Sequence, residues 1–171
     1  PAGEFMKGPD NFSFAVISDS GMRDEPLDLL IKEIKNKDVK FVFHLGDQAR
    51  DLSINHFEYL LEFLNKRLGG LPLYAVPGNH DITKSKKTTC LYYKRAFGQM
   101  HYYFSYGSTL FVILDTADGL FPKEQQLWLE NTLSRLRGGF KDCLVLMHVP
   151  PVDPRKGNSY AMEGDTEELK A

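Results

Sequence analysis

The sequence predicts an α/β fold in which parallel strands alternate with helices, and three observations favour this class. Short apolar, β-prone runs alternate with segments that are apolar at helical spacing. The order of these segments over residues 12–76 is β-α-β-α-β, which is typical of parallel strands joined by helical crossovers. Each apolar run ends in polar, glycine- or proline-containing turn residues.

Three strands and two helices are expected in the first half of the chain. The strands are predicted at the apolar runs Phe12–Ser18, Val39–Leu45 and Leu73–Val76. The first helix begins near the acidic residues and proline at 24–26 and keeps an apolar face as far as Ile34. The second helix has its apolar face between Phe57 and Leu68, and two glycines end it.

The stretch from residue 82 to residue 100 predicts a long loop. It is rich in lysine, threonine and tyrosine and shows no sustained period, apart from one helical turn near residues 92–97. Long loops inside compact domains are often functional. Lys84, Lys86 and Lys87 therefore form either a solvated lysine loop or a positively charged lid over a phosphate substrate.

A hairpin, a helix and a final strand complete the predicted fold. Tyr102–Tyr106 and Leu110–Leu114 flank Gly107-Ser108, a pattern that favours a β-hairpin. Lys123–Leu136 has leucines at helical spacing and predicts a helix. Cys143–Met147 is the last apolar run and predicts a strand.

Composition and charge limit the classes of function. The formal net charge of −2, without a basic stripe, argues against nucleic acid or an anionic membrane as partner. No apolar span is long enough for a transmembrane helix. Residues 1–5 precede Met6 and are interpreted as an expression-tag remnant, which leaves residues 6–171 as one domain. Cys90 and Cys143 form no metal-type pair, and a reducing, cytoplasmic location is the default expectation.

Polar side chains stand at the carboxyl ends of four predicted strands: Asp19, Asp47, Asn79 and His148. Ligand sites of parallel α/β sheets lie outside these strand ends, so the four side chains should converge. Three oxygen ligands and one imidazole favour hard or borderline divalent cations such as Mn²⁺, Fe²⁺, Mg²⁺ or Zn²⁺. A carboxylate at a central strand end could bridge two such ions, and an ion pair of this kind suits the hydrolysis of phosphate esters.

Four short blocks occur in order along the chain: Asp19-x-Gly21, Gly46-Asp47, Gly78-Asn79-His80-Asp81 and Val145-x-x-His148. Together they resemble the motifs of the calcineurin-like metallophosphoesterases. Gly21 and Val145 are similar to the purple acid phosphatase branch in particular, and Gln125-Gln126-x-Trp128-Leu129 resembles a helix of the same superfamily. The resemblance implies an α/β sandwich in which mixed central β-sheets are flanked by helices.

The resemblance also implies a role for each residue of the blocks. Asp47 would bridge two metal ions, and Asp19 would bind the first of them. Asn79 and His148 would bind the second ion. His80 would contact the phosphoryl group or protonate the leaving oxygen, with Asp81 orienting its ring. A metal-bound hydroxide would attack phosphorus in line.

The sequence departs from the family pattern at three places. Gly21 stands where many members have a histidine ligand. Arg50 stands where the purple acid branch has a tyrosine, so no purple chromophore is expected, and Arg50 either binds the substrate phosphate or pairs with Asp51. No histidine follows His148, so the downstream Gly-His-x-His block is missing. A chain that continues beyond Ala171 is favoured over natural loss of that block.

These features predict a metal-dependent phosphatase or phosphodiesterase with two divalent ions as cofactors and a phosphate ester as substrate. The alternative is a catalytically impaired, phosphoesterase-like module that binds a protein partner, because the missing histidines would weaken both metal sites. An enzyme should bind metal and hydrolyse an aryl phosphate. A binding module should do neither and still fold.

Overall fold

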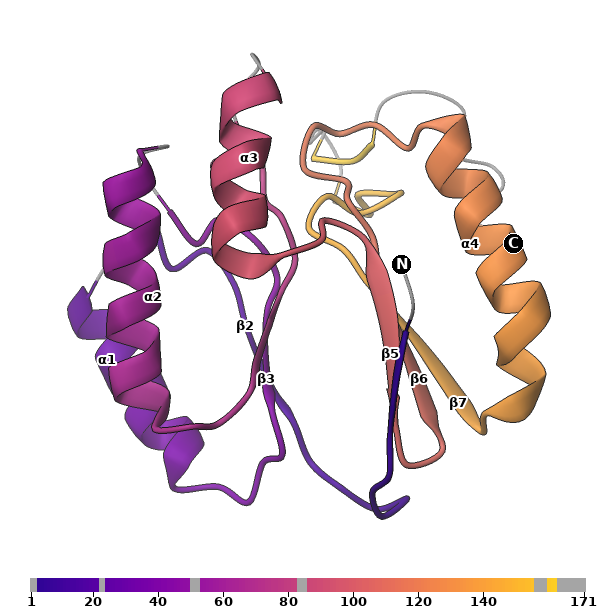
Figure 1. Cartoon of the computed structure of the whole chain (residues 1–171), viewed down its shortest axis with the longest axis horizontal. Coiled ribbons are helices and arrows are strands. Elements are labelled where there is room, and N and C mark those ends of the chain that lie inside the picture. The colour runs from indigo at the N-terminus through magenta and orange to yellow at the C-terminus, as the bar shows by residue number, and fades with distance from the viewer. Residues whose placement is uncertain (1–2, 22–23, 50–52, 83–85, 156–159, 163–171) are drawn as a thin grey trace.

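Two β-sheets face each other with helices on both outer sides, so the chain forms a layered α/β sandwich (Figure 1). The structure is a computed structural model, and it describes residues 3–21, 24–49, 53–82, 86–155 and 160–162. The expected α/β sandwich with mixed sheets flanked by helices is confirmed. None of the described helices is both long and apolar enough to cross a membrane.

One sheet contains three parallel strands in the order β2-β3-β4. These strands are β2 (Ala15–Ile17), β3 (Val42–His44) and β4 (Leu73–Ala75). The helices α1 (Asp24–Lys35) and α2 (Ile54–Leu68) connect them and pack on the outer face of this sheet. The predicted β-α-β-α-β order with parallel strands is therefore confirmed, and the carboxyl ends of β2, β3 and β4 lie at one end of the sandwich.

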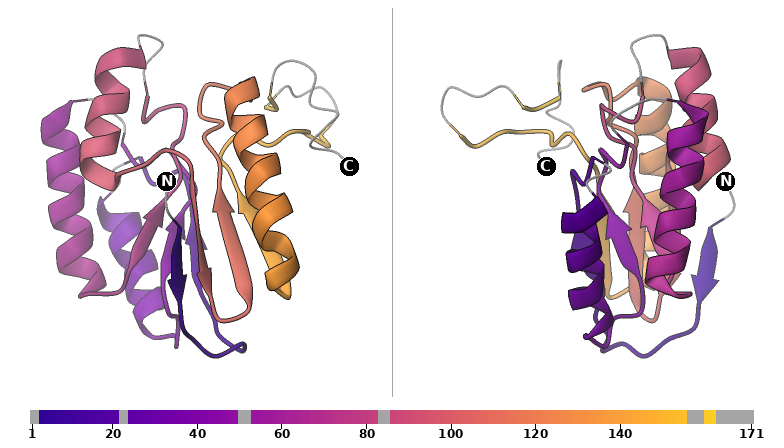
Figure 2. Two further views of the ribbon diagram at one scale, coloured as in Figure 1. Left: turned by 45° about the vertical axis from the view of Figure 1, so that its right-hand side comes forward. Right: turned by 90° about the vertical axis from the view of Figure 1, so that its left-hand side faces the viewer.

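The other sheet is mixed and has the order β1-β5-β6-β7. Its strands are β1 (Glu4–Met6), β5 (Tyr102–Tyr106), β6 (Thr109–Ile113) and β7 (Asp142–Leu146). The predicted hairpin is confirmed, since β5 and β6 pair antiparallel. The helix α4 (Lys123–Leu136) lies along the outer face of this sheet, and a short 3₁₀ turn, η1 (Arg137–Gly139), follows it (Figure 2).

Strand β1 differs from the expectation, because residues 1–5 were left out of the fold. Glu4 and Phe5 form this strand with Met6 and pair in parallel with Phe104–Tyr106 of β5. A three-residue strand carries too little pattern to be seen in a sequence, and its pairing depends on a strand almost a hundred residues away.

The interface between the two sheets is aromatic. Phe41 and Phe43 of the three-stranded sheet meet Phe104 and Phe111 of the other sheet, and all four are almost fully buried. The rings of Phe104 and Phe111 stack with centroids 5.0 Å apart. Burying one such side chain contributes about 1.5–3 kcal/mol, so this layer holds the two sheets together.

The long loop predicted for residues 82–100 is wrong, because α3 (Lys86–Phe97) fills most of it. Tyr93 and Phe97 pack on Phe57 of α2, with ring centroids 6.5 and 6.1 Å apart. This packing stabilises a helix whose threonines and lysines hide its apolar period in the sequence. In the proposed lysine lid, Lys84 and the side chains of Lys86 and Lys87 lie outside the part of the chain that the structure describes.

Candidate metal centre

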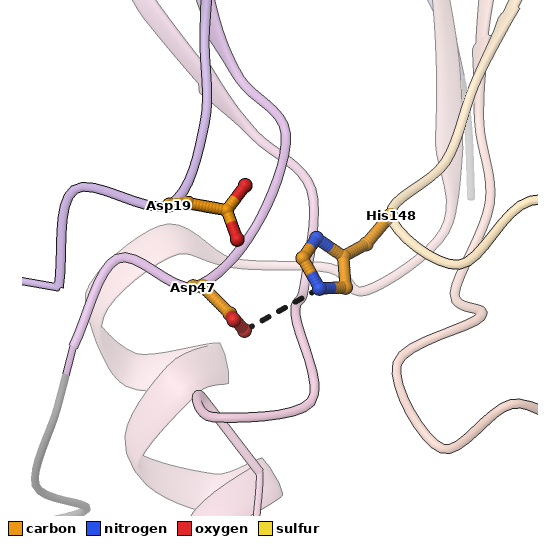
Figure 3. Close-up of side chains that lie close together, drawn as sticks. All are labelled: Asp19, Asp47 and His148. Carbon is orange, nitrogen blue, oxygen red and sulfur yellow. Dashed lines mark ion pairs between the residues drawn. The ribbon is translucent and has the colours of Figure 1, made fainter. Parts of the chain in front are cut away.

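The candidate site lies where the carboxyl ends of strands from both sheets meet. Asp19 follows β2, Asp47 follows β3 and Asn79 follows β4, while His148 follows β7 of the mixed sheet. Figure 3 shows the side chains of Asp19, Asp47 and His148 pointing toward one another. The predicted convergence of strand ends therefore occurs, and the site spans the seam between the two sheets.

Three of the side chains are close enough to share a cation, and Asn79 lies beside one of them. One ligand atom each from Asp19, Asp47 and His148 lies within 4.8 Å of the others. His148 Nε2 is 3.5 Å from Asp47 Oδ1 and 3.0 Å from the side-chain oxygen of Asn79. Asp47 and His148 are largely buried, whereas Asp19 and Asn79 are exposed. The site is thus anchored in the interior and open on one side.

Both aspartates sit on left-handed backbone. Asp19 and Asp47 each have φ of 56°, and among the described residues no other non-glycine residue has a positive φ. This conformation costs an ordinary L-residue roughly 1–2 kcal/mol, and aspartate tolerates it better than most. The amide of Asp19 donates to the Gly46 carbonyl, and the Gly21 amide donates to the Asp47 carbonyl, each at 3.0 Å. These two bonds tie the loop after β2 to the loop after β3 and hold both turns.

Two glycines let the three loops approach one another. A Cβ at Gly78 would overlap the backbone nitrogen and carboxylate of Asp47. A Cβ at Gly46 would overlap the ring of His148 and the Cα of Gly78, and Gly46 also has φ of 98°. The motifs therefore need glycine here for space beside Asp47 and His148, and at Gly46 also for backbone conformation.

The tautomer of His148 is set by a backbone carbonyl. Its Nδ1 lies 2.7 Å from the Leu45 carbonyl oxygen, which can only accept, so the proton belongs on Nδ1. The lone pair of Nε2 then faces the oxygen atoms of Asp47 and Asn79. Lone pairs that face one another repel, and a cation between them removes the repulsion. The residues therefore fit a divalent ion, and their oxygen-rich set matches a hard or borderline metal.

His80 and Asp81 are separated by the fold. The His80 side chain is 67% exposed, its amide donates to Asp47 Oδ1 at 2.9 Å, and its Nε2 lies 3.9 Å from Asp47 Oδ2. Asp81 is fully buried, and its two oxygens accept from the amides of Ala49 and Gly78, each at 2.9 Å. Burial raises the pKa of Asp81 to about 7. The family resemblance implies that Asp81 orients His80. In the structure, the Asp81 carboxylate accepts hydrogen bonds that join the loop after β3 to the loop after β4.

The sequence did not reveal how a buried histidine supports the loop of Asp19. His44, the last residue of β3, is fully buried, and its Nε2 lies 2.8 Å from the Ser20 hydroxyl. Burial lowers the pKa of His44 to about 4, so its ring is neutral near pH 7. From its place inside a strand, three residues before Asp47, the sequence predicts that His44 packs or supports the site rather than binding a metal, but it does not identify Ser20 as the partner. Arg50, expected near the substrate, lies outside the described residues.

Comparisons with known proteins show which proteins this chain is similar to. The chain is similar to a probable cyclic nucleotide phosphodiesterase of Fibrobacter succinogenes, with 27% identity over 116 residues that cover 67% of this chain and 43% of that protein. Its fold is similar to that of a purple acid phosphatase from yellow lupin (Lupinus luteus) seeds, with a TM-score of 0.74 and 17% identity. That match covers 95% of this chain and 36% of the lupin chain, so this chain spans less than half of either relative.

The family is established by a match that covers nearly the whole chain and all four motif blocks. Residues 12–170 match the family described as calcineurin-like phosphoesterase. The match includes every strand end that contributes to the candidate site. The chain belongs to the calcineurin-like phosphoesterase family.

Proposed function

We propose that this chain contributes the metal centre of a phosphoesterase that hydrolyses a phosphate ester with two divalent cations. The observation that carries the proposal is the convergence of Asp19, Asp47 and His148 within 4.8 Å, with the Asn79 oxygen beside His148. Lone pairs face one another there, and a polar protein interior seldom keeps such an arrangement without a cation.

The proposed ligands divide between two ions. Asp47 is central, since its carboxylate lies between His148 on one side and His80 on the other, and it would bridge the ions. Asp19 would hold the first ion, and Asn79 with His148 would hold the second. Bound cations would supply positive charge for the phosphoryl oxygens and make a water molecule more acidic.

The chain itself supplies the groups that handle the substrate. His80 is exposed beside Asp47, where its ring could donate a hydrogen bond to a phosphoryl oxygen or a proton to the leaving oxygen. Asp81 would act indirectly, by accepting hydrogen bonds from the amides of Gly78 and Ala49 and so holding the loops beside the site in place. Arg50 remains a proposed contact to the substrate phosphate.

The test combines metal binding with hydrolysis. Mn²⁺ is titrated into metal-free protein by calorimetry, and turnover of p-nitrophenyl phosphate and bis-p-nitrophenyl phosphate is measured beside an Asp47→Asn variant. Asp142→Asn, which changes an exposed aspartate at the start of β7, is the matched control. Metal-dependent turnover that Asp47→Asn abolishes and Asp142→Asn retains is the expected result.

The alternative function predicts another outcome in the same experiment. Among the described residues, His148 is the one imidazole in the group that could hold a metal ion, so a module that binds a protein partner is tested beside the enzyme. A folded protein that binds no Mn²⁺ and hydrolyses neither ester would contradict the proposal that the residues of this chain suffice for the reaction. Two explanations would then remain, a protein-binding module and a metal centre that residues outside this sequence complete, and the same assay on a longer chain would separate them. Because the Fibrobacter relative is described as a probable cyclic nucleotide phosphodiesterase, a cyclic nucleotide is the first natural substrate class to test.

A further inference from the structure

We propose that Thr116 and Gln125 are positioning residues for His148. They form a chain of hydrogen bonds that begins on α4, crosses the loop after β6 and ends at the residue that follows His148. This inference rests on the proposed metal site, because it concerns the placement of one of its ligands. Neither residue contacts the site itself.

The first link is a two-bond clamp made by Gln125. This side chain is 4% exposed, and its oxygen accepts from the Asp115 amide at 2.8 Å. Its Nε2 donates to the Asp115 carbonyl at 2.7 Å. Gln125 thus pairs both backbone groups of a single residue, as a neighbouring strand would. The clamp fixes the backbone at the end of β6 relative to α4.

The second link is the hydroxyl of Thr116, the next residue after the clamp. Thr116 is fully buried, and its Oγ1 accepts from the Val149 amide at 3.0 Å. Pairing of the main chain between β6 and β7 reaches Leu114, whose amide donates to Leu146. Pro150 and Pro151 have no amide hydrogen, so Val149 is the last donor before the chain leaves the sheet.

His148 is therefore fixed on three sides. Strand pairing holds the chain before it, Thr116 holds the residue after it, and the Leu45 carbonyl holds its ring at Nδ1. The segment that follows extends away from the sandwich (Figure 2), and the Met162 amide ties it back by donating to the Pro150 carbonyl at 2.9 Å. Partners that orient a metal ligand without binding the metal typically change its affinity roughly 10–100-fold when removed.

The test uses two variants that break different links. Thr116→Val keeps the shape of the side chain and removes the acceptor of the Val149 amide. Gln125→Met keeps the length and removes the clamp, so the test does not depend on whether Thr116→Val folds. We expect each to weaken Mn²⁺ binding, measured by calorimetry, roughly 10–100-fold. Thr116→Ser, which restores the hydroxyl, and Thr132→Val, which changes a buried threonine on α4 outside the chain of bonds, should bind as the wild type does.

A second readout is independent of metal. Hydrogen exchange at the Val149 amide and the ring ¹⁵N spectrum of His148 are measured in metal-free protein. Thr116→Val should speed exchange at Val149 and disturb the Nδ1-protonated tautomer, whereas Thr132→Val should change neither. Folded Thr116→Val and Gln125→Met variants with wild-type exchange, tautomer and affinity would overturn the inference. Wild-type protein that shows the protected amide and the tautomer but binds no Mn²⁺ would instead refute the proposed function alone.

Discussion

At the scale of single residues, the site depends on what is absent as much as on the ligands. Gly46 and Gly78 carry no side chain at the points where the loops after β3, β4 and β7 come together. The proposed ligands Asp47 and His148 occupy the space that a Cβ would need. The glycines of the family motifs are therefore as necessary as the proposed ligands, because they leave the space in which Asp47 and His148 lie.

Gly78→Ala should disrupt the site with a single methyl group. The new Cβ would overlap the backbone nitrogen and carboxylate of Asp47, so Asp47 must move. We expect Mn²⁺ affinity to fall at least about 10-fold, as loss of support for a ligand usually causes. Gly138→Ala is the control, since nothing lies within 4 Å of its Cβ position. Equal affinities of the two variants in calorimetry would show that the close approach is unimportant.

His44 should make stability depend on pH in a defined window. Its pKa is about 4 in the folded protein and about 6.5 when unfolded, so between these values the unfolded chain binds more protons. The stability that neutral His44 contributes is complete above pH 6.5 and is lost as the pH falls toward 4.

The expected size of this effect is on the order of 3 kcal/mol in metal-free protein. It is measured as the difference in unfolding free energy between the wild type and His44→Gln, from urea titrations at several pH values. Taking this difference removes the opposite trend of Asp81, whose raised pKa favours the folded state as the pH falls from 7. A difference that does not change between pH 4 and pH 7 would contradict the assignment.

At the scale of elements, the sequence predicted what depends on local pattern. The strands and helices with a clear apolar period, from β2 to β4 and from β5 to β7, were found, and so was the convergence of their polar ends. The sequence could not predict β1, which depends on pairing with β5, or α3, which depends on packing against α2. The sequence also could not predict which groups the Asp81 side chain contacts, because its partners are main-chain amides, which nearly every residue carries.

Within α3, one buried hydroxyl should reduce stability. Tyr93 is fully buried, and its hydroxyl oxygen has no hydrogen-bond partner in the described structure. Tyr93→Phe should therefore raise the free energy of unfolding by about 1 kcal/mol. Tyr102→Phe should lower it by about the same amount, because the Tyr102 hydroxyl donates to the Ala75 carbonyl at 3.1 Å. Chemical denaturation of both variants checks this, and a loss of stability in both would refute the role of the unpaired hydroxyl.

At the scale of the whole molecule, two edge strands of the sandwich carry exposed apolar side chains in the described structure. β2 and β7 are these edge strands, and Val16, Leu144 and Val145 are each 41% exposed or more. Val16 alternates with residues that pack under α1, and Leu144 shares a face with Leu146, so both are directed toward the layer between the sheets. An apolar edge with unpaired main-chain groups favours association with another strand.

Val145→Lys should therefore reduce self-association of this chain. A charge on an edge strand opposes pairing with a second edge, and the exposed side chain leaves room for it. Sedimentation over a range of protein concentrations should show less dimer or larger species than the wild type does. Leu127→Lys changes a residue on α4 that is 47% exposed, against 41% for Val145, and should leave the distribution unchanged. The prediction fails if both variants behave alike.

Because three of the proposed ligands come from one sheet and His148 from the other, a bound cation would act as a clasp between two halves of the molecule. The free energy of metal binding would then stabilise the contact between the two sheets. A free cation concentration a hundred times the dissociation constant would add about 2.7 kcal/mol to the free energy of unfolding. Removing the metal should let the halves part first at this seam, so the chemistry of the site and the integrity of the sandwich would respond together to the supply of metal in the cell.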